Sequence, residues 1–131
     1  MPQSVKGSRR ERELLRILQE RGFVVHRVAG SGVGEKAICD LVAVKEGKVF
    51  FYECKSRKKY YYPREDSKQL QILMTAANKC GARAMLAVKI NHKDWKFVNI
   101  SDHLSAPDEI NFKSLSEFLL NPTKVPEDSK I

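Results

Sequence analysis

Asp40, Glu53 and Lys55 are the residues whose types and spacing could do chemistry in this chain. Between the two acids, two runs rich in valine, leucine and aromatic residues flank the charged tip Lys-Glu-Gly-Lys. This pattern predicts a β-hairpin, in which a glycine supplies the backbone freedom that a tight turn requires. If Glu46 and Gly47 form a two-residue turn, Asp40 lies directly opposite Glu53 on the neighbouring strand.

Two opposed carboxylates in an apolar hairpin need a cation or a shared proton. Opposed residues hold their Cβ atoms roughly 4.5 to 5.5 Å apart, and like charges at that separation destabilise a sheet. By strand alternation Lys55 projects on the same face as Glu53, whereas a register slip of one residue would send one carboxylate to the other face. A divalent metal held by two carboxylates beside an ammonium group is a site for phosphodiester hydrolysis.

Length and charge narrow the class of protein. The chain has 131 residues, enough for one compact domain, which we assign to residues 1–120, followed by a flexible polar tail at residues 121–131. Its 24 Lys and Arg against 16 Asp and Glu give a net charge of +8, which favours polyanionic partners such as nucleic acid or an anionic membrane surface. Most of the excess positive charge lies in the half of the chain that contains the hairpin.

The sequence also indicates a compartment. No run approaches the roughly 18 to 20 apolar residues of a membrane span, and the N-terminus lacks a signal-peptide hydrophobic segment. We therefore expect a cytoplasmic protein that does not associate with membranes. The cysteines, at positions 39, 54 and 80, are odd in number and have no metal-binding spacing, so we expect reduced, packed thiols.

The first element that must support the hairpin is a helix. Residues 9–21 are dense in Arg, Glu and Leu and predict a helix with Ser8 as its N-cap and Gly22 at its end. Glu11 falls on the same stripe as the leucines of this helix. The glutamate either faces a partner on the core side or simply occupies the first turn, where acidic residues suit the helix dipole.

A strand and a loop come next. Residues 23–28 predict the first strand, with His26 and Arg27 on opposite faces, and we interpret the histidine as a surface or packed residue. Residues 29–36 contain three glycines and predict a flexible loop, in which Ser31 could close over a substrate. The loop lacks the Gly-Lys-Ser/Thr sequence of a phosphate-binding P-loop.

A basic and aromatic segment follows the hairpin directly. Residues 56–63 contain three consecutive cations, Arg57, Lys58 and Lys59, and then three tyrosines. Clustered cations attract phosphates and aromatic rings can stack on sugars or bases, so we interpret the segment as a DNA-contacting loop. The alternative is a solvated connector whose tyrosines partly pack on the core.

The second half of the chain predicts the rest of an α/β fold. Residues 64–80 predict a helix that ends at Gly81 and covers the sheet, with Gln69 either directed toward the hairpin or simply solvated. Residues 84–90 are almost continuously apolar, as in a strand covered on both faces, and Lys89 is therefore conspicuous. The apolar stripe of the helix consists of Leu70, Leu73, Met74 and Ala77. The remaining expectations are a last strand at 95–100, an irregular segment at 101–113 and a short helix at 114–120.

The order of helix, strand, hairpin, helix, strand and strand, with Asp40, Glu53-x-Lys55 and an upstream Glu11, resembles the PD-(D/E)xK nuclease superfamily. Cys39 replaces the proline of that motif, at a position that carries no chemistry. Within the superfamily, residues 6–100 resemble archaeal-type Holliday junction resolvases. The similar runs are Lys-Gly-Ser-Arg-Arg-Glu-Arg-Glu-Leu-Leu at 6–15, Gly-Phe-Val-Val-His-Arg-Val-Ala-Gly-Ser at 22–31, Asp-Leu-Val-Ala at 40–43, Tyr-Glu-Cys-Lys-Ser-Arg-Lys at 52–58 and Leu-Ala-Val-Lys at 86–89.

The resemblance implies a restriction-endonuclease-like core with a central mixed five-stranded sheet flanked by helices. It implies that Glu11, Asp40 and Glu53 hold Mg²⁺, with Mn²⁺ able to substitute, that Lys55 assists catalysis and that Ser31 acts near the scissile phosphate. Together with the basic segment, it places DNA contacts at Lys6, Arg9, Arg10, Arg12, Arg27, Arg57, Lys58, Lys59, Gln69 and Lys89.

The resemblance further implies a homodimer that cuts four-way DNA junctions by paired symmetric nicks in recombination and repair, where recombination proteins are conceivable partners. An isologous dimer would present two active sites to the two symmetry-related scissile strands. Two alternatives stay open at the level of sequence. One is another PD-(D/E)xK nuclease of the repair or restriction type, and the other is a catalytically idle DNA-binding module.

Overall fold

A computed structural model describes the backbone of residues 3–28 and 37–120 and the side chains from Ser8 onward in those ranges. The chain forms a five-stranded sheet with strands in the order β1, β2, β3, β4, β5. Only β3 and β4 are parallel, and the other three pairings are antiparallel. The sheet is therefore mixed, and the predicted α/β fold class is confirmed. The elements are α1 (Gln3–Glu20), β1 (Val24–Arg27), β2 (Leu41–Lys45), β3 (Lys48–Arg57), the 3₁₀ helix η1 (Pro63–Asp66), α2 (Ser67–Cys80), β4 (Arg83–Ile90), β5 (Lys96–Asn99), the 3₁₀ helix η2 (Ile100–His103), β6 (Leu104–Ala106), β7 (Glu109–Ile110) and α3 (Phe112–Leu120).

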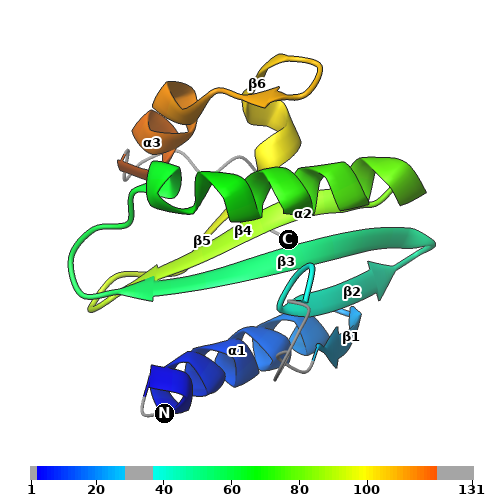
Figure 1. Ribbon diagram of the computed structural model, residues 1–131. Helices are drawn as coiled ribbons and strands as arrows, with labels where there is room; N and C mark the ends of the chain where they lie inside the picture. The colour runs from blue at the N-terminus through cyan, green and yellow to red at the C-terminus, as the bar shows by residue number, and fades with distance from the viewer. Residues whose placement is uncertain (1–2, 29–36, 121–131) are drawn as a thin grey trace.

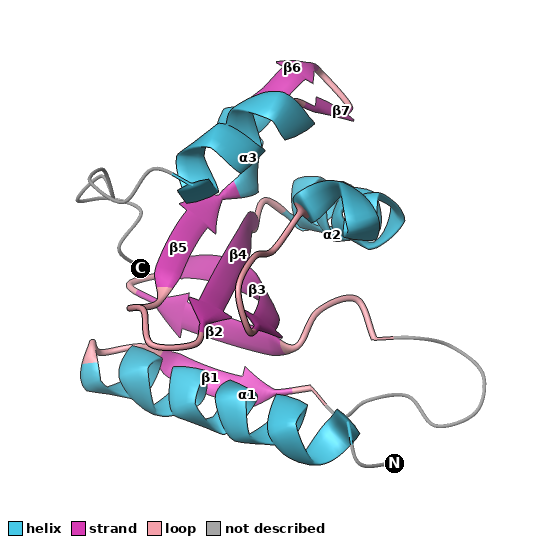
Figure 2. Cartoon of the chain, turned by 90° about the vertical axis from the view of Figure 1, so that its left-hand side faces the viewer, coloured by secondary structure: helices cyan, strands magenta, loops and turns pink. Residues whose placement is uncertain are grey.

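Helices cover both faces of the sheet. Helix α1 lies along one face, while α2 and α3 lie on the other (Figures 1 and 2). Leu14 and Leu18 of α1 are fully buried against the first face. On the opposite face, the predicted apolar stripe of α2 packs against alternate residues of β4. This sandwich explains why β4 is buried on both sides and reads as an unbroken apolar run.

The hairpin has the register that the sequence predicts. Val44 pairs with Val49 and Leu41 with Tyr52, where the paired residues end one position before Asp40 and Glu53. The turn residues Glu46 and Gly47 both have positive φ, of 52° and 79°. Two positive φ values characterise the type I′ turn, whose twist matches that of the strands it joins. The turn therefore sets which residues of β2 and β3 pair, and so the positions beyond the last pair from which the two carboxylates project.

The structure corrects four predicted boundaries. Helix α1 begins at Gln3, so Ser8 is not an N-cap but lies inside the helix. Strand β3 extends through Arg57, because pairing with β4 continues to the end of both strands. The second predicted helix begins as the 3₁₀ turn η1 before α2. The segment at 101–113, expected to be irregular, contains η2 and the small sheet of β6 and β7.

The thiols of Cys39, Cys54 and Cys80 are all free, as predicted, but only Cys39 is buried, whereas Cys54 is half-buried and Cys80 is exposed. Burial raises the pKa of the Cys39 thiol to about 12, so this side chain stays protonated and packs as a small apolar group. Among the described helices, none has both the length and the apolar character needed to cross a bilayer.

Candidate active site

The hairpin brings Asp40 and Glu53 together by backbone geometry. The amide of Asp40 donates a hydrogen bond of 2.9 Å to the carbonyl of Tyr52, which is already the partner of Leu41, so Asp40 lies at the end of the β2–β3 ladder and not in a ladder pair with Glu53. In return, the amide of Cys54 donates a 2.8 Å hydrogen bond to Oδ2 of Asp40. The aspartate is thus held by the strand on which Glu53 lies.

Glu53 is buried and Asp40 is half-buried. Glu53 is only 7% exposed and is the one charged residue among the buried side chains of the described chain. Burial, together with the nearby charge of Asp40, raises the pKa of Glu53 to about 7, against the lowering effect of Lys55. Burial likewise raises the pKa of Asp40 to about 6, against the stabilising hydrogen bond from Cys54. Buried like charges of this kind either share a proton or require a cation.

Lys55 supplies a positive charge at the edge of this pair. Its Nζ lies 3.4 Å from Oε2 of Glu53, as strand alternation predicts. The same Nζ lies 3.4 Å from Oδ1 of Asp66, at the end of η1. The hydroxyl of Tyr61 donates a 2.9 Å hydrogen bond to Oδ2 of Asp66. The ammonium group therefore sits between two carboxylates that come from two different elements.

Glu11 does have a partner on the core side of α1. Nε of Arg27 donates a 2.8 Å hydrogen bond to Oε1 of Glu11, and a second guanidinium nitrogen donates to the hydroxyl of Ser8 at 2.8 Å. The charge of Glu11 also raises the pKa of Asp40, so the helix places its carboxylate within electrostatic range of the hairpin. Of the two interpretations offered by the sequence, the structure supports the partnered one.

The carboxylate pair has donor atoms that a divalent cation prefers. Asp40 and Glu53 offer hard carboxylate oxygens in a buried pair that lacks full charge compensation, which suits Mg²⁺. Within residues 3–28 and 37–120, no three His, Cys, Asp or Glu side chains are close enough together to hold a metal ion. Because Mg²⁺ commonly binds through one or two carboxylates and keeps several waters, a two-carboxylate site is sufficient. Glu11, paired with Arg27, stands outside this immediate pair.

The cations expected to bind DNA lie in several environments. Arg12, Arg9, Lys58 and Lys59 are exposed. Arg10 is paired with Glu13 at 2.8 Å. Three of these cations, Arg9, Arg10 and Arg12, lie on α1, and Lys58 and Lys59 directly follow the end of β3.

Three other predicted contact residues have protein partners. Arg57 forms a 2.9 Å ion pair with Glu65 and lies over the ring of Tyr61. Gln69 donates to the carbonyl of Ile38 at 3.2 Å, which ties α2 to the residues just before Asp40. Lys89 donates to the carbonyls of Ile90 and Lys93 in the turn after β4, so part of its role is to close that turn.

Two predicted site residues cannot be placed. Ser31 lies outside the described residues, and its role near the scissile phosphate stays a prediction. Lys6 is within α1, but its side chain is not among those described.

Sequence reasoning missed Asp66 and Tyr61. Asp66 lies 11 positions after Lys55, beyond the basic segment, and Tyr61 is one of three consecutive tyrosines. Neither position has a spacing that points to the hairpin. The one available signal was an acidic residue just before a helix, and that pattern suggests an N-cap rather than a partner for a distant lysine.

Residues 2–121 match the family model described as archaeal Holliday junction resolvase (Hjc). The chain belongs to this family. Two curated members are the crossover junction endodeoxyribonucleases Hjc of Methanocaldococcus jannaschii, 41% identical over 96 residues, and of Archaeoglobus fulgidus, 37% identical over 110 residues.

The extent of these similarities differs. The match to the M. jannaschii protein covers 72% of this chain and 65% of the relative, slightly less than two thirds of its length. The match to the A. fulgidus protein covers 82% of this chain and 77% of the relative. The crystal structure of A. fulgidus Hjc superposes with a TM-score of 0.60 at 32% identity, covering 79% of this chain and 84% of that one. Family membership and the expected sheet architecture are therefore both confirmed.

Proposed function

We propose that this protein is a metal-dependent endodeoxyribonuclease that cuts four-way DNA junctions by paired, symmetric phosphodiester hydrolysis in recombination and repair. The observation that carries the proposal is the hairpin arrangement of Asp40, Glu53 and Lys55, a buried carboxylate pair with an ammonium group 3.4 Å from one of its oxygens. Membership in the Hjc family supports the junction as substrate.

Asp40 and Glu53 would hold the metal ion, and for Glu11 to contribute a third carboxylate from α1 its side chain would have to leave Arg27 and move toward the pair. When bound, Mg²⁺ supplies a water of lowered pKa and neutralises charge on the scissile phosphate, and Mn²⁺ has similar oxygen preferences. Lys55 directs an ammonium group to the same place, where it orients the nucleophile or stabilises the phosphate oxygens. The apolar walls of the hairpin keep water away and strengthen these interactions.

The DNA would lie along the basic surface around the hairpin. We assign phosphate contacts to cations on α1, at the end of β1 and after β3, because binding to a polyanion depends on such charges. Arg9, Arg12, Lys58 and Lys59 are exposed, and Arg10 has a single ion pair that a phosphate can replace. The proposed contacts are the predicted set Lys6, Arg9, Arg10, Arg12, Arg27, Arg57, Lys58, Lys59, Gln69 and Lys89.

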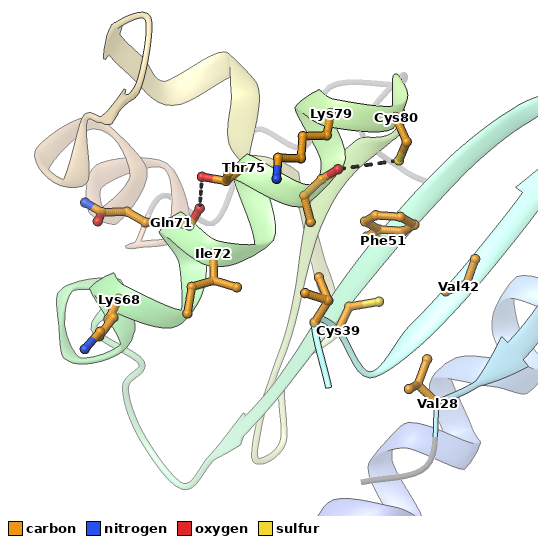
Figure 3. Close-up of a pocket in the computed structure, with 12 residues that line it drawn as sticks. Val28, Cys39, Val42, Phe51, Lys68, Gln71, Ile72, Thr75, Lys79 and Cys80 are labelled. Atoms are coloured by element: carbon orange, nitrogen blue, oxygen red, sulfur yellow. Dashed lines mark hydrogen bonds between the residues drawn. The ribbon is translucent and has the colours of Figure 1, made fainter. Parts of the chain in front are cut away.

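A homodimer would supply the second active site. An open groove of about 880 Å³ lies between α2 and the β1–β3 part of the sheet. Figure 3 shows Ile72 from α2 and Phe51 from β3 directed to the same space, with Val42 beside them. Apart from Lys68, Gln71, Thr75 and Lys79, the lining is apolar, which suits a second copy of the chain better than DNA phosphates. Cys39 also lines the groove, directly before Asp40, so a dimer formed here would bring two active sites close together.

The deciding experiment compares cleavage of a synthetic four-way junction with cleavage of a linear duplex of the same arm sequence, in Mg²⁺ and in EDTA. We expect metal-dependent, symmetric nicks in the junction alone. The Asp40→Asn variant should abolish cutting while leaving junction binding nearly intact, because the carboxamide keeps the shape but cannot hold the metal ion.

Other outcomes would favour other functions. Equal cutting of both substrates would indicate a general nuclease of the repair or restriction type, and a panel of mismatch, flap and duplex substrates would then identify its preference. Junction binding with no cutting in Mg²⁺ or Mn²⁺ would indicate a catalytically idle binding module.

A further inference from the structure

The position of Asp66 is unusual for a residue at the start of a helix. Asp66 occupies the N-cap position of α2, where an aspartate normally accepts a hydrogen bond from the first turn of the helix. Its side chain makes no such bond. Instead, its two oxygens face Lys55 at 3.4 Å and the hydroxyl of Tyr61 at 2.9 Å. The carboxylate is directed away from its own helix and toward the candidate active site.

Lys55 needs such a partner. A lysine side chain has four flexible carbons and a compact charge with no preferred plane, so one contact leaves its ammonium group poorly fixed. Glu53 provides one contact from the same strand, and its oxygens are also the proposed metal ligands. Asp66 provides the second contact from η1, so it continues to hold the ammonium group when the oxygens of Glu53 are engaged elsewhere.

Asp66 is itself held in place. Tyr61 is almost fully buried, and its hydroxyl donates to the carboxylate oxygen that does not face Lys55. Arg57 lies 3.9 Å from the same oxygen and stacks on the Tyr61 ring. A half-buried, hydrogen-bonded carboxylate of this kind fixes its partner more closely than a fully exposed one does.

We propose that Asp66, oriented by the hydroxyl of Tyr61, is a positioning residue that holds the ammonium group of Lys55 at the edge of the Asp40–Glu53 pair. This inference rests on the proposed nuclease function for its catalytic consequence. The contact itself joins the start of α2 to the hairpin, which no feature of the sequence predicts. Asp66 contacts the site through Lys55, so it is not assigned a role as a metal ligand.

Glu65 provides a matched control. It is the neighbouring residue in η1, carries the same charge and forms an ion pair with Arg57 at 2.9 Å, but no contact joins it to Lys55 or Tyr61. Glu65→Gln and Asp66→Asn therefore remove the same charge from the same turn. Only the second removes a partner of Lys55.

The first measurement is single-turnover cleavage of a four-way junction together with junction affinity in EDTA. Removing a partner of an active-site group commonly lowers activity by about 10 to 100-fold. We expect a loss of that size for Asp66→Asn and a smaller loss for Tyr61→Phe, each with affinity unchanged. Glu65→Gln should cleave like the wild-type protein, and Asp66→Glu, which keeps the carboxylate, should recover part of the rate.

The second measurement does not depend on cleavage. Acetylation of Lys55 by an amine-reactive reagent, followed by mass spectrometry, reports how firmly its ammonium group is held. We expect faster acetylation in Asp66→Asn and Tyr61→Phe than in Glu65→Gln, whose rate should match the wild type.

Unchanged acetylation in both test variants would overturn the proposal even if the protein were inactive on DNA. Equal losses of cleavage in Asp66→Asn and Glu65→Gln would also overturn it, since the cause would then be the charge of the turn. A wild-type protein that does not cut junctions would instead contradict the proposed function.

Discussion

The amide of Cys54 donates a 2.8 Å hydrogen bond to Oδ2 of Asp40, so the strand that carries Glu53 also holds the second carboxylate. Asp40 cannot turn away from Glu53 without breaking this bond. The two acids consequently stay together in a buried setting, where each makes ionisation of the other less favourable.

The metal-free protein should lose stability as the pH rises. The pKa of Asp40 is raised to about 6 and that of Glu53 to about 7, both above their values in an unfolded chain. The folded state therefore binds these protons more tightly, and the stability it gains below about pH 4 is lost as the pH rises toward 7. We expect the free energy of unfolding, measured by urea titration in EDTA, to fall by roughly 2 kcal/mol between pH 5 and 7.5.

Comparison with Glu53→Gln isolates the carboxylate contribution. Burial lowers the pKa of His103, so that residue changes stability in the opposite direction over part of this range. The variant lacks one of the two acids and should show a weaker pH dependence, while Mg²⁺ should restore stability to the wild type at pH 7.5. A wild type and variant with the same pH dependence would show that folding does not raise the pKa values of the pair as described.

Arg27 should contribute to DNA affinity through charge. It lies at the end of β1 beside Glu11, where a phosphate could replace the glutamate as its partner. Each phosphate contact contributes about one unit to the slope of log affinity against log salt concentration. We expect Arg27→Ala to weaken junction binding and reduce this slope by about 1. Lys48→Ala, which removes an exposed cation from the hairpin tip, is the control and should leave the slope unchanged. An unchanged slope in Arg27→Ala would remove this residue from the interface.

Ile72 should be required for dimerisation. Its side chain is 43% exposed and lines the apolar groove between α2 and the sheet. Ile72→Glu would place a charge in the proposed interface, and light scattering at micromolar concentration should then show a monomer where the wild type is a dimer. Val24→Glu is the matched control, since Val24 is also exposed but does not line the groove. A wild type that is monomeric would contradict the dimer, and a dimeric Ile72→Glu would place the interface elsewhere.

The hairpin turn offers a test of register. Glu46 adopts a φ of 52°, which an asparagine tolerates better than a glutamate does. Asn-Gly is the preferred sequence of a type I′ turn, so we expect Glu46→Asn to stabilise the protein by roughly 0.5 kcal/mol with cleavage unchanged. Gly47→Ala, at a φ of 79°, should destabilise it by about 1 kcal/mol. A Glu46→Asn variant that is less stable than the wild type would argue against this turn in solution.

Local patterns in the sequence were sufficient to predict the main helices and strands and the side chains at the core of the site. Alternation of apolar residues and the Glu46-Gly47 turn predicted the pairing of β2 with β3, because turn geometry and a two-residue period determine register over short distances. The same period placed Lys55 beside Glu53. Helical spacing likewise identified the buried stripe of α2.

The ends of elements were harder to predict, since they depend on contacts made elsewhere. Ser8 has the residue type of an N-cap, yet α1 starts earlier and uses the serine hydroxyl to bind Arg27 across the fold. Strand β3 runs to Arg57 because β4 continues beside it. Pairing between strands separated by a whole helix leaves no local signature.

The sequence by itself therefore determined that two carboxylates and a lysine meet on one hairpin, because turn and strand periodicity act between near neighbours in the chain. Only the tertiary structure decided which groups surround them. Arg27 reaches Glu11 from another element, and Asp66 reaches Lys55 from the start of α2. Such contacts arise when packing of helices on a sheet brings distant residues together. Residue type and spacing do not indicate which of the acidic side chains will contact Arg27 or Lys55.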